Sequence, residues 1–320
     1  MKKILLILPY FGNLNAAGFF PLFLQSCRKN ESIDFLLLTD DKTEYDYPTN
    51  VHAVMTTFQE IRERFQRHFS FSISLEKPYK LCDFKLAYGE IFAEEVKSYD
   101  AWGFCDLDLI FGDLRKFLTE ERLERYGRVY TRGHLGVFRT DIPLDFYQHP
   151  LPDKPDYTQV LSSAESYSFD EWINRNPDWD ALRFYGYQSY AGMDNFDVSP
   201  PSRSFPGAFR RARSSRDPDI TEKERHIHQN MLFYEDGRLY RIGIKNGNQL
   251  MKEEIIYAHF QKRKMKLRVS DLNSSIIAAP NYFANAPEPK NALDVLKYQL
   301  DVTRADYFSE AISRKIHFKK

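Results

Sequence analysis

The hydrophobic positions in the first hundred residues follow two alternating spacings. Residues 3–9 and 33–38 are continuous apolar runs, which are typical of strands buried on both faces. Residues 17–30, 58–69 and 83–99 instead carry apolar residues at helical spacing. A third apolar run follows the last of these helices. Strands and helices in this order predict an open α/β sheet with right-handed crossovers.

The third predicted strand ends in two aspartates, Asp106 and Asp108. Alternate residues of an extended chain point the same way, so both carboxylates project where the strand emerges. Two converging carboxylates are costly unless a positive group lies between them. A divalent cation, Mg²⁺ or Mn²⁺, is the simplest such group, and it often carries substrate phosphates. We therefore predict a metal–diphosphate site at this strand end.

The second predicted strand also ends in acids, Asp40 and Asp41. Ligands of open α/β sheets lie beyond the carboxyl ends of the strands, so we expect both acidic pairs to face one crevice. The alternative for Asp40 is a turn or cap role, which is common for Asp after a strand.

The second half of the chain has shorter elements. Residues 129–139 and 254–260 predict strands, and residues 230–243 predict a hairpin that turns at Asp236-Gly237. Ser168 is expected to cap a helix over residues 168–176. Residues 186–219 are rich in Gly, Pro, Ser and Arg, and so long an irregular segment is usually functional.

Composition narrows the class of protein. The 320 residues carry 45 basic and 45 acidic side chains, so no global charge points to a nucleic-acid partner. Three cysteines without a CxxC pair indicate reduced thiols and a cytoplasmic protein. The N-terminal apolar run is short and ends at Pro9, which favours a first core strand over a secretory signal. No apolar stretch approaches the roughly 20 residues of a membrane span.

A later segment offers further ligands for a metal–diphosphate. His259 follows a predicted strand, and Lys262 and Arg263 come directly after it. Imidazole is an acceptable ligand for Mn²⁺, and cations here could neutralise a diphosphate as the bond to its substituent breaks. A single histidine near a strand end is more often structural, so its role depends on meeting the Asp106–Asp108 pair.

Asp106-Leu107-Asp108 resembles the DxD motif of GT-A glycosyltransferases, which use nucleotide-sugar donors. Residues 79–89 and 258–265 resemble signature blocks of a bacterial family found with capsule and O-antigen synthesis genes. The resemblance implies a GT-A-like, Rossmann-type mixed sheet flanked by helices over residues 1–265. Its nucleotide-sugar half would span residues 1–140 and its acceptor half residues 141–265. A C-terminal helical extension, residues 266–320, would follow.

The resemblance also implies roles for matching residues. Asp106 and Asp108 would hold the metal and the diphosphate of the donor, and Asp40 or Asp41 would meet the base or ribose. The other implied donor-site residues are His259 as a metal ligand, Lys262 and Arg263 at the diphosphate, and Lys80, Asp83 and Lys85 near the donor. The alternative for the last three is a solvated helix start, where Asp83 is favoured by the helix dipole.

Asp170 and Glu171 are the best candidates for the acid–base residue. An inverting enzyme needs a carboxylate to deprotonate the acceptor hydroxyl, and the neighbouring Phe169 and Trp172 could stack on a sugar. Acids are also favoured in the first turn of any helix, which is the structural alternative. A retaining enzyme would not need this base, so the sequence leaves the stereochemistry open.

These observations predict a metal-dependent glycosyltransferase that moves a sugar, UDP-linked in our interpretation, to a bacterial surface glycan such as capsule or lipopolysaccharide. The acceptor would be a glycan or a lipid-linked glycan, and Arg203 to Arg216 would form a lid or acceptor loop. The basic helical tail, residues 291–320, could touch the inner face of the membrane, although such tails more often pack on their own domain. The alternatives are a nucleotidyltransferase, disfavoured because Gly12 and Gly18 are widely spaced, and a noncatalytic carbohydrate-binding protein.

Overall fold

A computed structural model describes residues 1–192, 194–198, 227–246, 248–261, 263–279 and 282–300 of the chain. The chain divides into two compact units. Unit 1 comprises residues 1–14, 23–109 and 114–193, and unit 2 comprises residues 15–22, 110–113 and those from 194 onward. The boundaries expected near residues 140 and 265 do not coincide with this division.

Unit 1 is built on a seven-stranded mixed sheet with the strand order β3-β2-β1-β4-β7-β6-β8. Neighbours among β1 to β4 are parallel, β7 is antiparallel to both β4 and β6, and β8 is parallel to β6. Helices flank this sheet, which confirms the predicted mixed α/β class. The strands are β1 (Ile4–Pro9), β2 (Ile33–Thr39), β3 (Val51–Met55), β4 (Ala101–Cys105), β6 (Arg128–Val129), β7 (Leu135–Arg139) and β8 (Ser189–Tyr190).

The helical segments around this sheet are mostly short. Only α1 and α2 exceed two turns among the described α-helices before residue 190, and five segments are 3₁₀ turns. They are α1 (Phe20–Arg28), α2 (Phe58–His68), η1 (Pro78–Ala87), α3 (Tyr88–Ile91), α4 (Ala93–Val96), α5 (Leu114–Phe117), α6 (Glu120–Arg125), η2 (Phe146–Gln148), α7 (Tyr157–Ser162), η3 (Phe169–Glu171), α8 (Trp172–Arg175), η4 (Pro177–Trp179) and η5 (Ala181–Tyr185).

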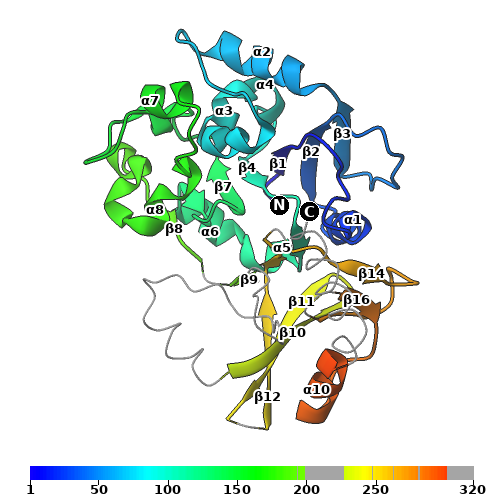
Figure 1. The fold of residues 1–320 in the computed structure, drawn as a ribbon. Coiled ribbons are helices and arrows are strands. Elements are labelled where there is room, and N and C mark those ends of the chain that lie inside the picture. Colours follow the sequence, from blue (N-terminus) through cyan, green and yellow to red (C-terminus); the bar gives the residue numbers. More distant parts are fainter. Residues whose placement is uncertain (193, 199–226, 247, 262, 280–281, 301–320) are drawn as a thin grey trace, which may run out of the picture. The chain divides into compact units, whose positions relative to one another are not determined.

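Alternation along the strands decides which side chains meet the covering helices. Leu5 and Ile7 of β1 lie opposite Trp102 and Phe104 of β4 and share one apolar cluster with residues of α2, η1 and α3. Figure 1 shows α2, α3 and α4 alongside these strands. The sheet is therefore covered on this face by the segment that precedes β4 in sequence.

Two predicted helices have different outcomes. The helix over residues 58–69 is confirmed as α2, and Thr57 caps it: its hydroxyl accepts from Glu60 N, and the Glu60 carboxylate accepts from Thr57 N at 2.7 Å. The single helix expected over residues 83–99 is instead split into η1, α3 and α4. Phe92, which has a non-helical backbone conformation, separates α3 from α4.

Unit 2 contains two sheets. The six-stranded sheet has the order β12-β11-β10-β15-β16-β14, and the three-stranded sheet the order β5-β13-β9. The predicted hairpin is confirmed as β10 and β11, which turn at Asp236-Gly237. The strands are β5 (Leu109–Phe111), β9 (Phe196–Asp197), β10 (Ile227–Glu235), β11 (Arg238–Lys245), β12 (Gln249–Ile255), β13 (Tyr257–His259), β14 (Lys266–Arg268), β15 (Ile276–Ala279) and β16 (Tyr282–Asn285).

The C-terminal region departs from expectation. Residues 266–285 were expected to be helical, but β14, β15 and β16 lie there and extend the six-stranded sheet. Their apolar residues, such as Ile276, Ile277 and Phe283, are buried in the cores of unit 2. The helical expectation holds for α10 (Ala292–Leu300), whereas the rest of the predicted tail and the segment Arg203 to Arg216 lie outside the described residues.

No helix among the described residues combines the length and apolarity needed to cross a membrane.

Candidate functional site

The carboxyl ends of β1, β2 and β4 meet at one edge of the unit 1 sheet. The three strands are parallel neighbours, so Asp40 after β2 and Asp106 after β4 lie at the same edge, as predicted. Asp40 accepts from Gly12 N at 2.7 Å, and Asp41 accepts from Leu14 N at 2.8 Å. The acids after β2 therefore also hold the loop that follows β1.

Tyr10, which follows β1, lies within electrostatic range of both acidic segments. Partial burial raises the pKa of its hydroxyl, and the negative charges of Asp108 and Asp41 raise it further. No role for this tyrosine was expected from the sequence. Its only signal was its position, one residue beyond the carboxyl end of the first strand.

Asp106 and Asp108 offer the carboxylate pair that the sequence predicted. Their ligand oxygens lie within 4.8 Å of one another, and both side chains are half-buried. The backbone N–H of Asp106 donates to the carbonyl of His134 at 2.9 Å, which ties the strand end to the start of β7. Oxygen donors at this separation fit a hard divalent cation such as Mg²⁺ or Mn²⁺.

Lys85 connects Asp106 to the candidate base. Its Nζ donates to Asp106 Oδ1 at 2.6 Å and to the Gly133 carbonyl at 2.6 Å, and it lies 3.3 Å from Asp170 Oδ2. Burial alone would lower the pKa of this ammonium, but Asp106 and Asp170 outweigh burial and hold the pKa well above its usual value. A carboxylate has two oxygens, so an ammonium and a metal ion can share Asp106.

Asp170 is the buried carboxyl of the site. Burial raises its pKa to about 6, against the opposing effect of the Lys85 ammonium. Glu171 is more exposed and accepts from Gly133 N at 3.3 Å, with His134 Nε2 at 4.0 Å. The two acids predicted as a catalytic pair are thus placed differently: Asp170 inside the cluster, and Glu171 at its edge.

Lys80 and Asp83 form a buried clamp on the segment before Asp170. The Lys80 ammonium donates to Asp83 Oδ2 at 2.9 Å and to the backbone carbonyls of Val160 and Glu165. Asp83 in turn accepts from Phe169 N at 2.9 Å and from Tyr167 N. Both side chains are almost fully enclosed, so the solvated helix start considered for them is wrong. Their placement near the donor stays a prediction.

Two expectations for the residues next to Asp170 are wrong: Ser168 does not cap a helix, and Phe169 and Trp172 are not available to stack on a sugar. Ser168 has left-handed backbone angles and no capping hydrogen bond, because Asp83 accepts from the first N–H of η3 in its place. Phe169 and Trp172 are buried, with ring centroids 4.7 Å apart. Both rings belong to the core and present no free face to a sugar.

Arg128 contacts the backbone of Asp170, a role that was not expected from the sequence. Its guanidinium donates to the Asp170 carbonyl at 3.1 Å and to the carbonyls of Tyr130 and Thr131. Burial lowers its pKa to about 10. A charged residue that opens an apolar strand was the available signal, since a buried arginine is unusual unless paired.

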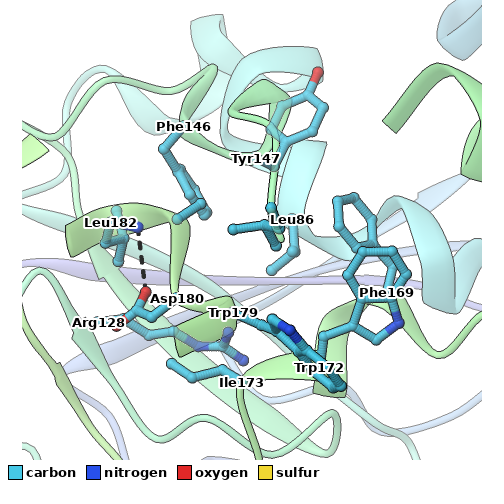
Figure 2. Close-up of a pocket in the computed structure, with 12 residues that line it drawn as sticks. Leu86, Arg128, Phe146, Tyr147, Phe169, Trp172, Ile173, Trp179, Asp180 and Leu182 are labelled. Carbon is cyan, nitrogen blue, oxygen red and sulfur yellow. Dashed lines mark hydrogen bonds between the residues drawn. The ribbon is translucent and has the colours of Figure 1, made fainter. Parts of the chain in front are cut away.

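Arg128 also lines the cavity drawn in Figure 2, between Trp172, Trp179 and Asp180. Asp180 Oδ1 accepts from Leu182 N at 3.2 Å, which starts η5 beside this cavity. The space open to a water-sized molecule is about 20 Å³, enough for little more than one water. The cavity is therefore too small to admit a sugar.

His259 is positioned by the three-stranded sheet of unit 2. Its strand, β13, is the hydrogen-bonded neighbour of β5, and Gly112 N donates to the Ile256 carbonyl at 2.7 Å. The Val198 N–H donates to the His259 carbonyl at 2.8 Å. The strand β5 begins one residue after Asp108, so the chain passes directly from the acidic pair of unit 1 to the strand beside β13. A metal-binding role for His259 together with Asp106 and Asp108 stays a prediction.

Of the two basic residues predicted after His259, the structure describes only Arg263. Arg263 is buried in unit 2, and burial lowers its pKa to about 10. Lys262 lies outside the described residues. A diphosphate-binding role for either residue stays a prediction.

The chain belongs to a family of unknown function, DUF6625, whose profile matches residues 6–287. No curated protein matches the sequence. Among solved structures, the chain is similar to the galactosyltransferase LgtC in complex with donor and acceptor sugar analogs. The identity is 13%, the match covers 82% of this chain and 88% of that one, and the TM-score is 0.37. An active-site mutant of LgtC gives 14% identity, 85% and 91% coverage and a TM-score of 0.39. Both likenesses are too low to transfer a function.

Proposed function

We propose that this protein is a metal-dependent glycosyltransferase of the GT-A type. It transfers a sugar from a nucleotide donor, the UDP-linked form expected from the sequence, to a bacterial surface glycan. One observation carries the proposal: Lys85 joins the Asp106–Asp108 pair to Asp170, a buried carboxyl whose pKa is about 6. The Lys85 ammonium thus contacts both Asp106, a candidate metal ligand, and Asp170, a candidate proton acceptor. A metal-dependent, inverting glycosyl transfer to a hydroxyl uses both.

Asp106 and Asp108 would hold Mg²⁺ or Mn²⁺, with His259 as the third protein ligand. The pairing of β13 with β5, directly after Asp108, supports the inclusion of His259. When bound, the cation offsets the charge that develops on the leaving diphosphate. Asp40 and Arg263 are proposed donor contacts, as is Lys262, which lies outside the described residues.

Asp170 accepts the proton of the acceptor hydroxyl in this proposal. A pKa of about 6 leaves most of the carboxylate ionised at neutral pH while keeping it more basic than an exposed aspartate. Lys85 and the backbone contact from Arg128 fix its position. Glu171 is the second candidate. A retaining reaction would not need this base, so replacing Asp170 also tests the stereochemical course.

The acceptor class and cellular location complete the proposal. The acceptor would be a glycan or lipid-linked glycan made on the cytoplasmic side of the membrane, where nucleotide sugars are available. Residues 301–320, which contain the basic end of the chain, lie outside the described residues. Peripheral contact of that tail with the membrane stays a prediction.

Calorimetric titration with UDP, with and without Mn²⁺, tests the proposal. We expect binding that requires the metal and weakens about 100-fold in Asp108→Asn, because a metal ligand is lost. Glu121→Gln, which removes an exposed acid on α6, should bind like the wild type. A screen of UDP- and GDP-sugars for hydrolysis would then identify the donor.

Two outcomes would contradict the proposal. Binding of a nucleoside triphosphate with release of pyrophosphate would identify a nucleotidyltransferase. The absence of both nucleotide binding and sugar-nucleotide hydrolysis would leave a noncatalytic carbohydrate-binding protein.

A further inference from the structure

The 3₁₀ geometry of η1 aligns three residues that an α-helix would separate. Residues three apart eclipse one another in a 3₁₀-helix, so Tyr79, Cys82 and Lys85 form one row, here called the η1 row. The Lys80–Asp83 ion pair, also three residues apart, occupies a second row. The Lys80–Asp83 pair therefore lies on a different side of η1 from the row that contains Lys85, Cys82 and Tyr79.

Exposure increases along the η1 row. Lys85 is buried against Asp106 and Asp170, and Cys82 is half-buried with its Sγ 3.4 Å from Ser166 Oγ. Tyr79, at the outer end, is 70% exposed. The row thus runs from the buried carboxyl to the protein surface.

Tyr79 lies within electrostatic reach of the candidate base. Partial burial raises the pKa of its hydroxyl, and the Cys82 thiol and the Asp170 carboxylate raise it further. Among the described residues, no hydrogen bond or ring contact engages this side chain. Its large exposed ring is therefore not explained by the packing of the fold.

We propose that Tyr79 is the acceptor-binding residue, whose ring stacks on the sugar that presents its hydroxyl to Asp170. This inference rests on the proposed glycosyltransferase function. One face of a sugar ring is mostly C–H and packs on an aromatic ring, while its hydroxyls remain available for hydrogen bonds. Phe169 and Trp172, the aromatics next to Asp170 in sequence, cannot serve because both are buried.

The position of Tyr79 favours the acceptor over the nucleotide. The η1 row ends at Lys85 and Asp170, where the acceptor hydroxyl would be deprotonated. The acids expected at the nucleotide, Asp40 and Asp41, instead contact the loop after β1. Stacking of Tyr79 on the nucleotide base is the competing outcome, and the experiment below separates the two.

Steady-state kinetics with a panel of p-nitrophenyl glycosides as acceptors tests this role, using the full chain and the sugar nucleotide that the wild type hydrolyses. Tyr79→Ala should raise the acceptor KM about tenfold, the loss expected for one aromatic stacking contact. Tyr79→Phe should keep a wild-type KM, because the ring rather than the hydroxyl makes the contact. Phe184→Ala, an exposed aromatic on η5 that stacks on His149, is the matched control and should change nothing.

Labelling of Cys82 supplies a second measurement that does not depend on turnover. The other two cysteines, Cys27 and Cys105, are buried, so a thiol reagent should modify Cys82 first. Burial raises the pKa of the Cys82 thiol to about 12, which calls for labelling at alkaline pH. A bound glycoside should slow this labelling in the wild type and in Tyr79→Phe but not in Tyr79→Ala, and Cys82→Ser should remove the signal.

The inference is overturned if Tyr79→Ala keeps a wild-type acceptor KM, or if no glycoside of the panel protects Cys82 in an enzyme that hydrolyses the donor. An equal rise in the KM of the sugar nucleotide would assign Tyr79 to the nucleotide base instead. Failure of the proposed function gives a different result, because the wild type would then neither bind UDP with Mn²⁺ nor hydrolyse any sugar nucleotide.

Discussion

Lys85 is the residue on which the candidate site depends. Its ammonium contacts Asp106, Asp170 and a backbone carbonyl, and it offsets part of the cost of burying Asp170. Removing one member of a buried charged group leaves the other charges unpaired. The stability lost in this way exceeds the net stability that the contact contributes. We therefore expect the protonation of Asp170 to be sensitive to Lys85.

The pH dependence of transfer should report on Asp170. A base must be unprotonated, so kcat/KM should fall about tenfold per pH unit below a pKa of about 6. Lys85 lowers the pKa of Asp170, so Lys85→Met should move the acid limb to higher pH, whereas Lys85→Arg should keep it near its wild-type position. Asp170→Asn should lower kcat by about 10²-fold or more. Rates with the same acid limb in Asp170→Asn would assign the limb to another group.

At the level of elements, η1 holds the segment before Asp170 through the buried Lys80–Asp83 clamp. Asp83→Asn leaves the Lys80 ammonium without its charged partner and should cost about 3 kcal/mol in the free energy of unfolding, measured with urea. Thr57→Ala, which removes the cap of α2, should cost about 1 kcal/mol and leave transfer unchanged.

A double variant separates stability from positioning. Lys80→Met with Asp83→Leu removes both buried charges and should recover most of the stability lost in Asp83→Asn. In the double variant the N–H groups of Tyr167 and Phe169 lose the acceptor that Asp83 provides, so kcat should fall although stability recovers. Recovery of both stability and kcat would show that the clamp does not position Asp170.

For the whole molecule, binding should appear as a shift in unfolding. All three tryptophans, Trp102, Trp172 and Trp179, belong to unit 1, as do Asp106 and Asp108, so tryptophan fluorescence reports the unfolding of that unit. A ligand present at 100 times its Kd stabilises the folded state by about 2.7 kcal/mol. UDP with Mn²⁺ should therefore raise the melting temperature by several degrees in the wild type but not in Asp108→Asn. The same rise with UDP alone would contradict a metal requirement.

Much of unit 1 follows from the sequence. The apolar runs that became β1, β2 and β4 are continuous because these strands are covered on both faces, and that pattern is local. The acids that follow β2 and β4 must then lie at one edge of a parallel sheet, whatever packs around them. The Asp236-Gly237 turn and the α2 cap are equally local signals, and both are found where expected.

The tertiary structure alone decided how these residues work together. Lys85 meets Asp170, and Arg128 meets the same residue, across separations that no spacing along the chain encodes. The pKa of Asp170 depends on burial by segments folded around it, and the partners of Lys80 and Lys85 on η1 come from segments distant in sequence. Local pattern therefore determined the strands and the acids at their ends. The charge state and neighbours of those acids came from packing, because burial and electrostatic interaction depend on distance in space rather than on distance along the chain.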